Sequence, residues 1–233
     1  MNGKIRYLLI ILTSISLLTY GQNNHLSIGM NSNGICLGNA KNYNGIKLNL
    51  WDTNGETFNG LNFSFLSSSQ YANGVRLSIL MSDDSICNGL SVGCLAASAY
   101  RMNGIAIAGL AVLAKKKFNG LGISGFGISA DTMNGVFISL IGSTNFTHSN
   151  PRLISRVNGV SIGLLCGVNC EEFKGLAIGF NNVTKIHKGV TIGCINKSAE
   201  LHGIQFGFWN VANNNRVFKK TPLINFNFKA SKK

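Results

Sequence analysis

The residues best suited to chemistry lie in the last third of the chain. His187 and His202 occur in successive units of a repeat, and thiol and carboxylate groups lie close by in sequence: Cys170, Glu171, Glu172 and Glu200. Imidazole, thiolate and carboxylate groups are the usual ligands of zinc, so stacking of the units could bring them together. The two histidines are offset by one place in the repeat, however, and the set lacks a ligand spacing. We therefore interpret it as a polar edge and assign no metal-binding residue.

The acidic and nucleophilic residues lack the spacing that catalysis requires. Asp83 and Asp84 are adjacent, as are Glu171 and Glu172, whereas glycoside hydrolysis needs two carboxylates that face each other across a cleft. Residues 122–125 (Gly-Ile-Ser-Gly) miss the spacing of a nucleophile elbow. The glycine-rich runs lack the Gly-Lys-Ser/Thr ending of a phosphate-binding loop. The sequence therefore predicts a non-enzymatic protein with no catalytic or cofactor-binding residue and no cofactor.

Most of these candidates fall in an internal repeat that explains their residue types. A glycine, usually after Asn, is followed by an aliphatic residue, any residue, an aliphatic or Phe, and a small residue. We number each unit from its glycine, so that position 1 is the next residue. The twelve repeat glycines are Gly34, Gly45, Gly60, Gly74, Gly89, Gly104, Gly120, Gly135, Gly159, Gly175, Gly189 and Gly203. Most intervals are 14 to 16 residues, with exceptions of 11 and 24, and such a repeat fixes the class of architecture.

Alternation at period two is typical of a β-strand, because successive side chains point to opposite faces. The large residues at positions 1 and 3 are therefore expected to form one face and to supply the core. The small residue at position 4 belongs to the other face, where a neighbouring backbone or layer could approach closely. Polar clusters between the units are expected to be turns: residues 67–70, 82–85, 115–117 and 213–215.

Two all-β architectures fit the repeat. A β-solenoid is favoured, because all units share one polarity and because Asn182, Asn196 and Asn210 hold the same place in three successive units, as in a ladder of parallel coils. The alternative is an antiparallel outer-membrane β-barrel of about 14 strands. It is supported by residues 25–30, which resemble a short unit before a hairpin turn at Asn33-Gly34, and by the alternating strand at 223–228.

The two ends differ from the repeat domain. Residues 1–21 place Lys4 and Arg6 before a short apolar run, the order of a secretory signal peptide, although an N-terminal anchor remains an alternative. The repeat domain is expected to span 22–229, with a long insertion at 143–157 as a candidate binding loop, and 230–233 form a basic tail.

The chain is strongly basic, with a formal net charge of +13. The basic residues between the strands could bind an anionic envelope glycan or lipid, although they could also only solvate the turns and protect exposed edges. No nucleic-acid partner is expected, membrane association is expected, and the oligomeric state is open.

The six cysteines would permit disulfides in an oxidising compartment. Cys94 and Cys194 hold position 5, where large apolar residues stand in other units, so they are expected to be small core residues. A bridge between Cys166 and Cys170 is an open possibility that spacing alone does not decide.

Two units, at 175–182 and 203–210, resemble the Gly-Val-Gln-Ile-Gly-Leu-Val-Asn phrase of a bacterial surface-repeat family, best known from leptospiral and Bacteroidetes envelope proteins. Residues 221–228 also resemble the closing segment of that family. The resemblance implies an exported, envelope-associated protein and brings no enzymatic residues with it. We expect a structural or adhesive surface protein. The alternatives are a barrel with a pore or structural role and a secreted hydrolase or metal-binding protein.

Overall fold

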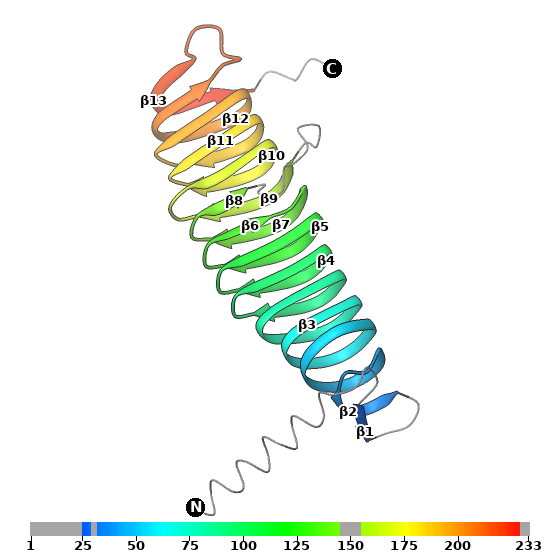
Figure 1. Cartoon of the computed structure of the whole chain (residues 1–233). Helices are drawn as coiled ribbons and strands as arrows, with labels where there is room; N and C mark the ends of the chain where they lie inside the picture. The colour runs from blue at the N-terminus through cyan, green and yellow to red at the C-terminus, as the bar shows by residue number, and fades with distance from the viewer. Residues whose placement is uncertain (1–24, 29–31, 145–154, 229–233) are drawn as a thin grey trace, which may run out of the picture.

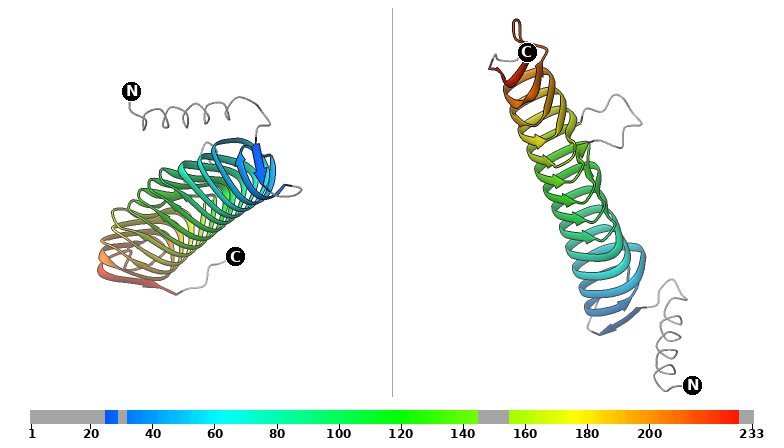
Figure 2. Two further views of the ribbon diagram at one scale, coloured as in Figure 1. Left: turned by 90° about the horizontal axis from the view of Figure 1, so that it is seen from below. Right: turned by 90° about the vertical axis from the view of Figure 1, so that its left-hand side faces the viewer.

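The chain folds into a rod of stacked β-coils (Figure 1). The computed structural model describes residues 25–28, 32–144 and 155–228, and these form a β-solenoid of about 11 turns. The chain advances along the rod coil by coil, so that the first and last strands lie at opposite ends (Figure 2). The expected signal peptide, most of the insertion and the basic tail lie outside the described residues.

The strands follow one another around the coils. In chain order they are β1 (His25–Ile28), β2 (Asn33–Gly38), β3 (Asn42–Gly93), β4 (Ala96–Ala108), β5 (Ala111–Ser124), β6 (Gly127–Ser129), β7 (Thr132–Ser139), β8 (Gly142–Thr144), β9 (Arg156–Gly163), β10 (Gly167–Gly179), β11 (Asn181–Ile192), β12 (Ile195–Ala212) and β13 (Lys220–Asn227). The longest, β3, has 52 residues and therefore runs through several coils without a break.

Successive coils pair in parallel and in register. Gly89 lies opposite Gly104 and Gly104 opposite Gly120, and the same match holds from β2 to β12. Even the 24-residue interval keeps the match, because Gly135 lies opposite Gly159. This parallel pairing decides between the two expected architectures in favour of the solenoid.

The repeat glycines form a column that only glycine can occupy. The φ angle is 121° at Gly104 and 132° at Gly120, a region that side chains rarely allow. A Cβ atom at Gly104 would also overlap the backbone oxygen of Gly89, one coil earlier. The conformation and the close approach of the coils therefore both require glycine at this corner.

Asparagine side chains reinforce the same corner. The residue before the repeat glycine is Asn in nine successive units: Asn33, Asn44, Asn59, Asn73, Asn88, Asn103, Asn119, Asn134 and Asn158. From Asn44 onward, each Nδ2 donates to the Oδ1 of the preceding Asn at 2.7–2.9 Å. The ladder that the sequence predicted lies elsewhere in the coil and is confirmed, because Asn182 donates to Asn196 at 3.0 Å and Asn196 to Asn210 at 2.8 Å.

The prediction of which face is inside was wrong. The large residues at positions 1 and 3 point outward, while positions 2 and 4 point inward, as Ala106 and Ala108 illustrate. The main core column is instead two places before the repeat glycine, and its residues are all buried: Tyr43, Phe58, Ala72, Cys87, Met102, Phe118, Met133, Val157, Phe173, His187 and Leu201. A coil of about 15 residues encloses a narrow interior, so it accepts few large side chains per turn.

Small residues in one coil make room for large side chains of the same coil and of its neighbour, so that the interior is filled. Phe137, at position 2, meets the ring of Phe118 edge to face at 5.2 Å between centroids. The coil before it has Gly122 at position 2, where a Cβ atom would lie only 2.8 Å from Phe118 and 3.1 Å from Phe137. Gly122 therefore makes room for both aromatic rings.

Three of the four polar clusters that were expected to be turns lie in strands. Residues 67–70, 82–85 and 115–117 continue the parallel ladders around the corners of the coil, and among the four clusters only 213–214 form a turn. The corners are smooth because each backbone group bonds to the coil above or below instead of within its own turn.

An antiparallel strand covers each end of the rod. β1 pairs with β2, from His25 opposite Gly38 to Ile28 opposite Ile35. The two segments therefore pair antiparallel, as a hairpin would, but the predicted turn at Asn33-Gly34 was wrong because both residues begin β2. At the other end, β13 pairs with β12. Terminal units of this kind cover the edge to which another sheet could add.

Candidate functional site

The most distinctive surface is a row of large apolar side chains that runs the length of the rod. It consists of the outward side chains at positions 1, 3, 5 and 6, and we call it the outer apolar face. Ile105 at position 1 and Ile192 at position 3 are 41% and 42% exposed. Ile79 and Phe180, both at position 5, are 58% and 54% exposed. Each of these side chains is covered by its counterparts in the neighbouring coils but remains open on its outer side.

The outer apolar face carries no charge. None of the twelve units has Asp, Glu, Lys or Arg at position 1, 3, 5 or 6. Eleven steps of about 4.8 Å make the face about 50 Å long, and its flat part is at least about 10 Å wide. About 500 Å² of apolar surface lies in the upper half of the range of about 300–600 Å² for the largest apolar patch on a monomeric protein, and such a patch is often functional.

Aromatic residues gather along one edge of this face. Both tryptophans of the chain, Trp51 and Trp209, hold position 6 and are about half exposed, as is Phe126 at the same position. Trp51 also contacts Phe65 of the next coil at 5.9 Å between ring centroids. Position 6 begins the corner at which the apolar face ends.

Basic residues border the opposite edge, on the other side of the glycine corner. They lie one or three places before the repeat glycine and point outward: Arg101, Lys117, Arg156, Lys174 and Lys188. We call this row the basic rim. Arg101 lies opposite Lys117 in the neighbouring coil, and Lys174 opposite Lys188.

Glu172 balances part of the basic rim. Its carboxylate lies 3.1 Å from Arg156, 3.4 Å from Lys174 and 3.7 Å from Lys188. Partial burial acts to raise the pKa of Glu172, but the three cations outweigh it and lower that pKa. Glu172 therefore stays ionised and spaces the three cations along the rim.

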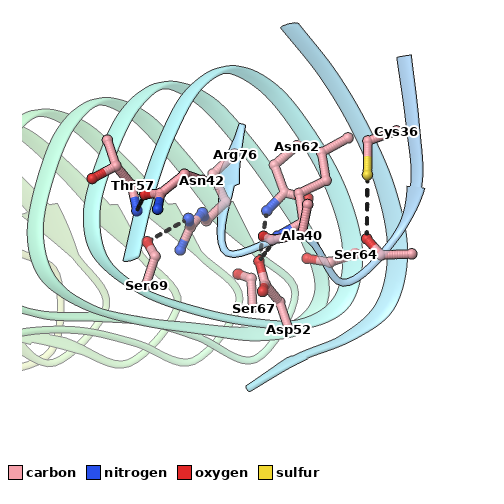
Figure 3. Close-up of polar contacts among 12 residues, drawn as sticks. Cys36, Ala40, Asn42, Asp52, Thr57, Asn62, Ser64, Ser67, Ser69 and Arg76 are labelled. Atoms are coloured by element: carbon pink, nitrogen blue, oxygen red, sulfur yellow. Dashed lines mark hydrogen bonds and ion pairs between the residues drawn. The ribbon is translucent and has the colours of Figure 1, made fainter. Parts of the chain in front are cut away.

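The interior of the first coils contains two buried ion pairs. Figure 3 shows Asp52 and Asn62 near the first pair, and Ser69 beside Arg76 of the second. Lys47, at position 2, donates through Nζ to Asp52 at 2.9 Å and to the carbonyl oxygen of Ala40 at 2.8 Å. Asn62, at position 2 of the following coil, donates to the same carboxylate at 3.4 Å. A lysine can be buried here because its charge is paired and hydrogen-bonded.

The second buried pair joins Arg76 and Asp84. Asp84 accepts from Arg76 and also from the backbone N–H and hydroxyl of Ser69, at 3.0 and 2.8 Å. The guanidinium group also donates to Ser69 at 2.8 Å and lies over the ring of Phe58. The two interior pairs are neutral overall, so the whole excess of positive charge lies elsewhere in the chain.

The structure does not bring together the ligand set considered from the sequence. His187 points inward, is stacked on Phe173 with ring centroids 5.1 Å apart, and exchanges a hydrogen bond with Thr191. Burial lowers its pKa to about 4. His202, one place later in the register, points outward and lies 3.9 Å from Glu200. Within the described ranges, no three His, Cys, Asp or Glu residues group closely enough to hold a metal ion.

The two adjacent aspartates considered for catalysis point to opposite sides of their strand. Asp84 is inside, whereas Asp83 points outward and accepts from Ser98 at 2.9 Å. The expectation that Cys94 and Cys194 are core residues was wrong, because position 5 faces outward: Cys94 is exposed and Cys194 half-buried.

All six cysteines are free thiols in the structure, and Cys166 and Cys170 are not bridged. Cys166 is exposed, whereas Cys170 is buried. Burial raises the pKa of the thiol to about 11 at Cys87 and to about 12 at Cys170. These two buried groups are therefore uncharged side chains of the core.

Comparisons with known protein families, with curated proteins and with solved structures found no match. Among the residues that the structure describes, no helix has the length and apolar character needed to cross a membrane.

Sequence reasoning found the residues of the outer apolar face but assigned them to the core. A signal for the outward direction was present, because position 2 accepts residues as different as Lys47, Gly122 and Phe137. Such variation at inward positions, together with uniform aliphatic residues at outward positions, distinguishes a narrow coil from a wide one.

Proposed function

We propose that this protein is a non-enzymatic, exported rod of the outer envelope or cell surface, with a structural or adhesive role. The observation that carries the proposal is the outer apolar face, which is uncharged in all twelve units and open to solvent along the rod. A surface of this size is unfavourable to leave in water and therefore suits a binding role.

Two further features support this function. The signal-peptide pattern of residues 1–21 and the resemblance of the last units to envelope repeat proteins both favour export. The histidines and carboxylates that could have supported catalysis lie on opposite sides of their strands, and the inward ones are held by core contacts. The inward groups stabilise the coils and are not available to a substrate, and the outward groups are thereby left without their inward neighbours as catalytic partners.

Fractionation of cells that express the full chain tests the proposal. We expect the protein in the envelope fraction, released by urea or carbonate because no strand has to be unpaired to detach it. A matched chain that lacks residues 1–21 should remain in the cytoplasm. Recovery of the full chain in the cytoplasm would contradict export, and turnover of glycan, lipid or peptide substrates by the purified protein would contradict a non-enzymatic role.

A further inference from the structure

We propose that the outer apolar face lies flat on the surface of a lipid bilayer that contains anionic headgroups. This inference rests on the proposed envelope role and names the surface to which the rod binds. The rod would bury the side chains of positions 1, 3, 5 and 6 at the boundary between headgroups and acyl chains, about 5–10 Å deep, as interfacial amphipathic helices do.

The backbone of this face can enter a lipid environment without penalty. Strands β4 and β5 pair on both sides, with the coil before and the coil after, so their backbone N–H and C=O groups are bonded along the rod axis. In lipid each unsatisfied backbone group costs several kcal/mol, which excludes most irregular surfaces. A stack of paired coils presents only side chains, and at these positions they are uncharged and, apart from Asn39 and Asn181, apolar.

The two edges of the face have the composition of a membrane interface. The aromatic edge contains both tryptophans, and Trp is enriched where hydrocarbon meets headgroups. The basic rim places Arg101, Lys117 and Arg156 along the other edge. Long basic side chains can lay their methylene groups along an apolar surface while the charge reaches a phosphate. The chain has 21 Lys and Arg against 8 Asp and Glu, so the rod as a whole complements an anionic surface.

A second copy of the chain fits this face less well. A stable dimer buries about 800 Å² on each partner, and a flat contact with the outer apolar face, about 50 Å by at least about 10 Å, approaches that area only if the corner is covered too. Two copies would also bring together two molecules with the same large excess of positive charge. A bilayer, by contrast, adapts to the curved corner and so covers positions 5 and 6 as well.

Vesicle binding of the purified protein tests the inference directly. The probes are sedimented vesicles of phosphatidylcholine alone and of phosphatidylcholine with phosphatidylglycerol. Because Trp51 and Trp209 are the only tryptophans, their fluorescence reports on the aromatic edge. We expect binding that is stronger with phosphatidylglycerol, a blue shift of the emission, and quenching by lipids brominated on the acyl chains.

Substitutions measure separately how much the outer apolar face and the basic rim contribute to vesicle binding. Ile107→Asn with Ile123→Asn places two amides side by side at position 3 of neighbouring coils, and we expect binding to fall at least about tenfold. Leu113→Asn, which changes an outward residue away from this face, is the matched control and should bind like the original protein. Arg101→Gln and Lys117→Gln should each reduce binding to anionic vesicles about fivefold.

The outcomes are distinct. Circular dichroism and melting curves first establish that each variant is folded. Absence of vesicle binding, or binding that the position 3 variants leave unchanged, would overturn the inference. A dimer in solution that the same variants dissociate would assign the face to a second copy and overturn it as well. Envelope fractionation is independent, so the protein could still be recovered there through a glycan or protein partner while the lipid inference fails.

Discussion

Acid should destabilise the coil that contains His187, and the size of the effect follows from its burial. Burial lowers the pKa of this imidazole from 6.5 to about 4. The unfolded chain therefore binds the proton more readily, so the stabilising contribution is present above pH 6.5 and is lost as the pH falls towards 4. A difference of 2.5 pKa values corresponds to about 3 kcal/mol, of which about 2.5 kcal/mol is lost by pH 4.5.

The variant His187→Phe removes this titration and keeps the shape of the column. A phenyl ring can keep the stacking on Phe173, and Phe118 already occupies the equivalent place elsewhere. At neutral pH the variant should lose about 1 kcal/mol, because Thr191 loses its hydrogen bond to the imidazole. Between pH 7 and 4.5, however, the original protein should lose about 2 kcal/mol more than the variant.

Urea unfolding followed by circular dichroism at the two pH values measures both quantities. Carboxylates that titrate in the same range contribute equally to the two proteins and cancel in the difference. His202→Gln, which changes the outward histidine of the next coil, is the matched control and should leave the acid-induced loss in place. Equal losses in the original protein and in His187→Phe would refute the argument that burial of this ring makes the rod acid-sensitive.

Three further predictions concern the coils themselves. Gly104→Ala combines positive φ with overlap of a backbone oxygen, so we expect loss of folded protein, seen as aggregation or loss of the strand signal in circular dichroism. Asp84→Asn leaves the buried charge of Arg76 without its partner and should cost about 3–5 kcal/mol in urea unfolding, whereas adding Arg76→Met should recover much of that loss. Cysteines introduced at Ile178 and Ile192, which pair across neighbouring coils, should crosslink on oxidation. A pair displaced by one further coil should not, and failure of the adjacent pair in folded protein would contradict parallel register.

The sequence was sufficient to predict the solenoid because its evidence is periodic. Asn182, Asn196 and Asn210 recur at one place in successive units, and only parallel coils turn such recurrence into a ladder. The repeat glycine recurs in the same way and marks one corner. Because coil-to-coil contacts link residues about 15 apart, the spacing of the sequence directly reports the pairing.

The direction of the faces could not be predicted from periodicity alone; its signal lies in the variation of residue type at position 2. Alternation shows that Ile105 and Ile107 share a face, but it does not show whether that face is inside. The answer depends on the width of the coil, and a turn of about 15 residues encloses an interior too narrow for two large residues at positions 1 and 3 of every unit. The buried pairs of Lys47 and Arg76 were missed for the same reason, since a charged residue at position 2 seemed to belong outside.

The narrow coil also explains why stability and binding should be linked in this protein. Because the interior accepts few large side chains in each turn, the aliphatic residues at positions 1 and 3 gain burial only from their counterparts above and below. This arrangement stabilises the stack along its axis but leaves the outer side of every ladder in water, as the exposure of Ile105 and Ile192 shows. A partner that covers the outer apolar face would supply the missing burial and would therefore stabilise the folded rod, by an amount that grows with the logarithm of its affinity. Under the proposed function, the same apolar rows that hold the coils together would therefore provide both the surface for binding and the free energy that drives it.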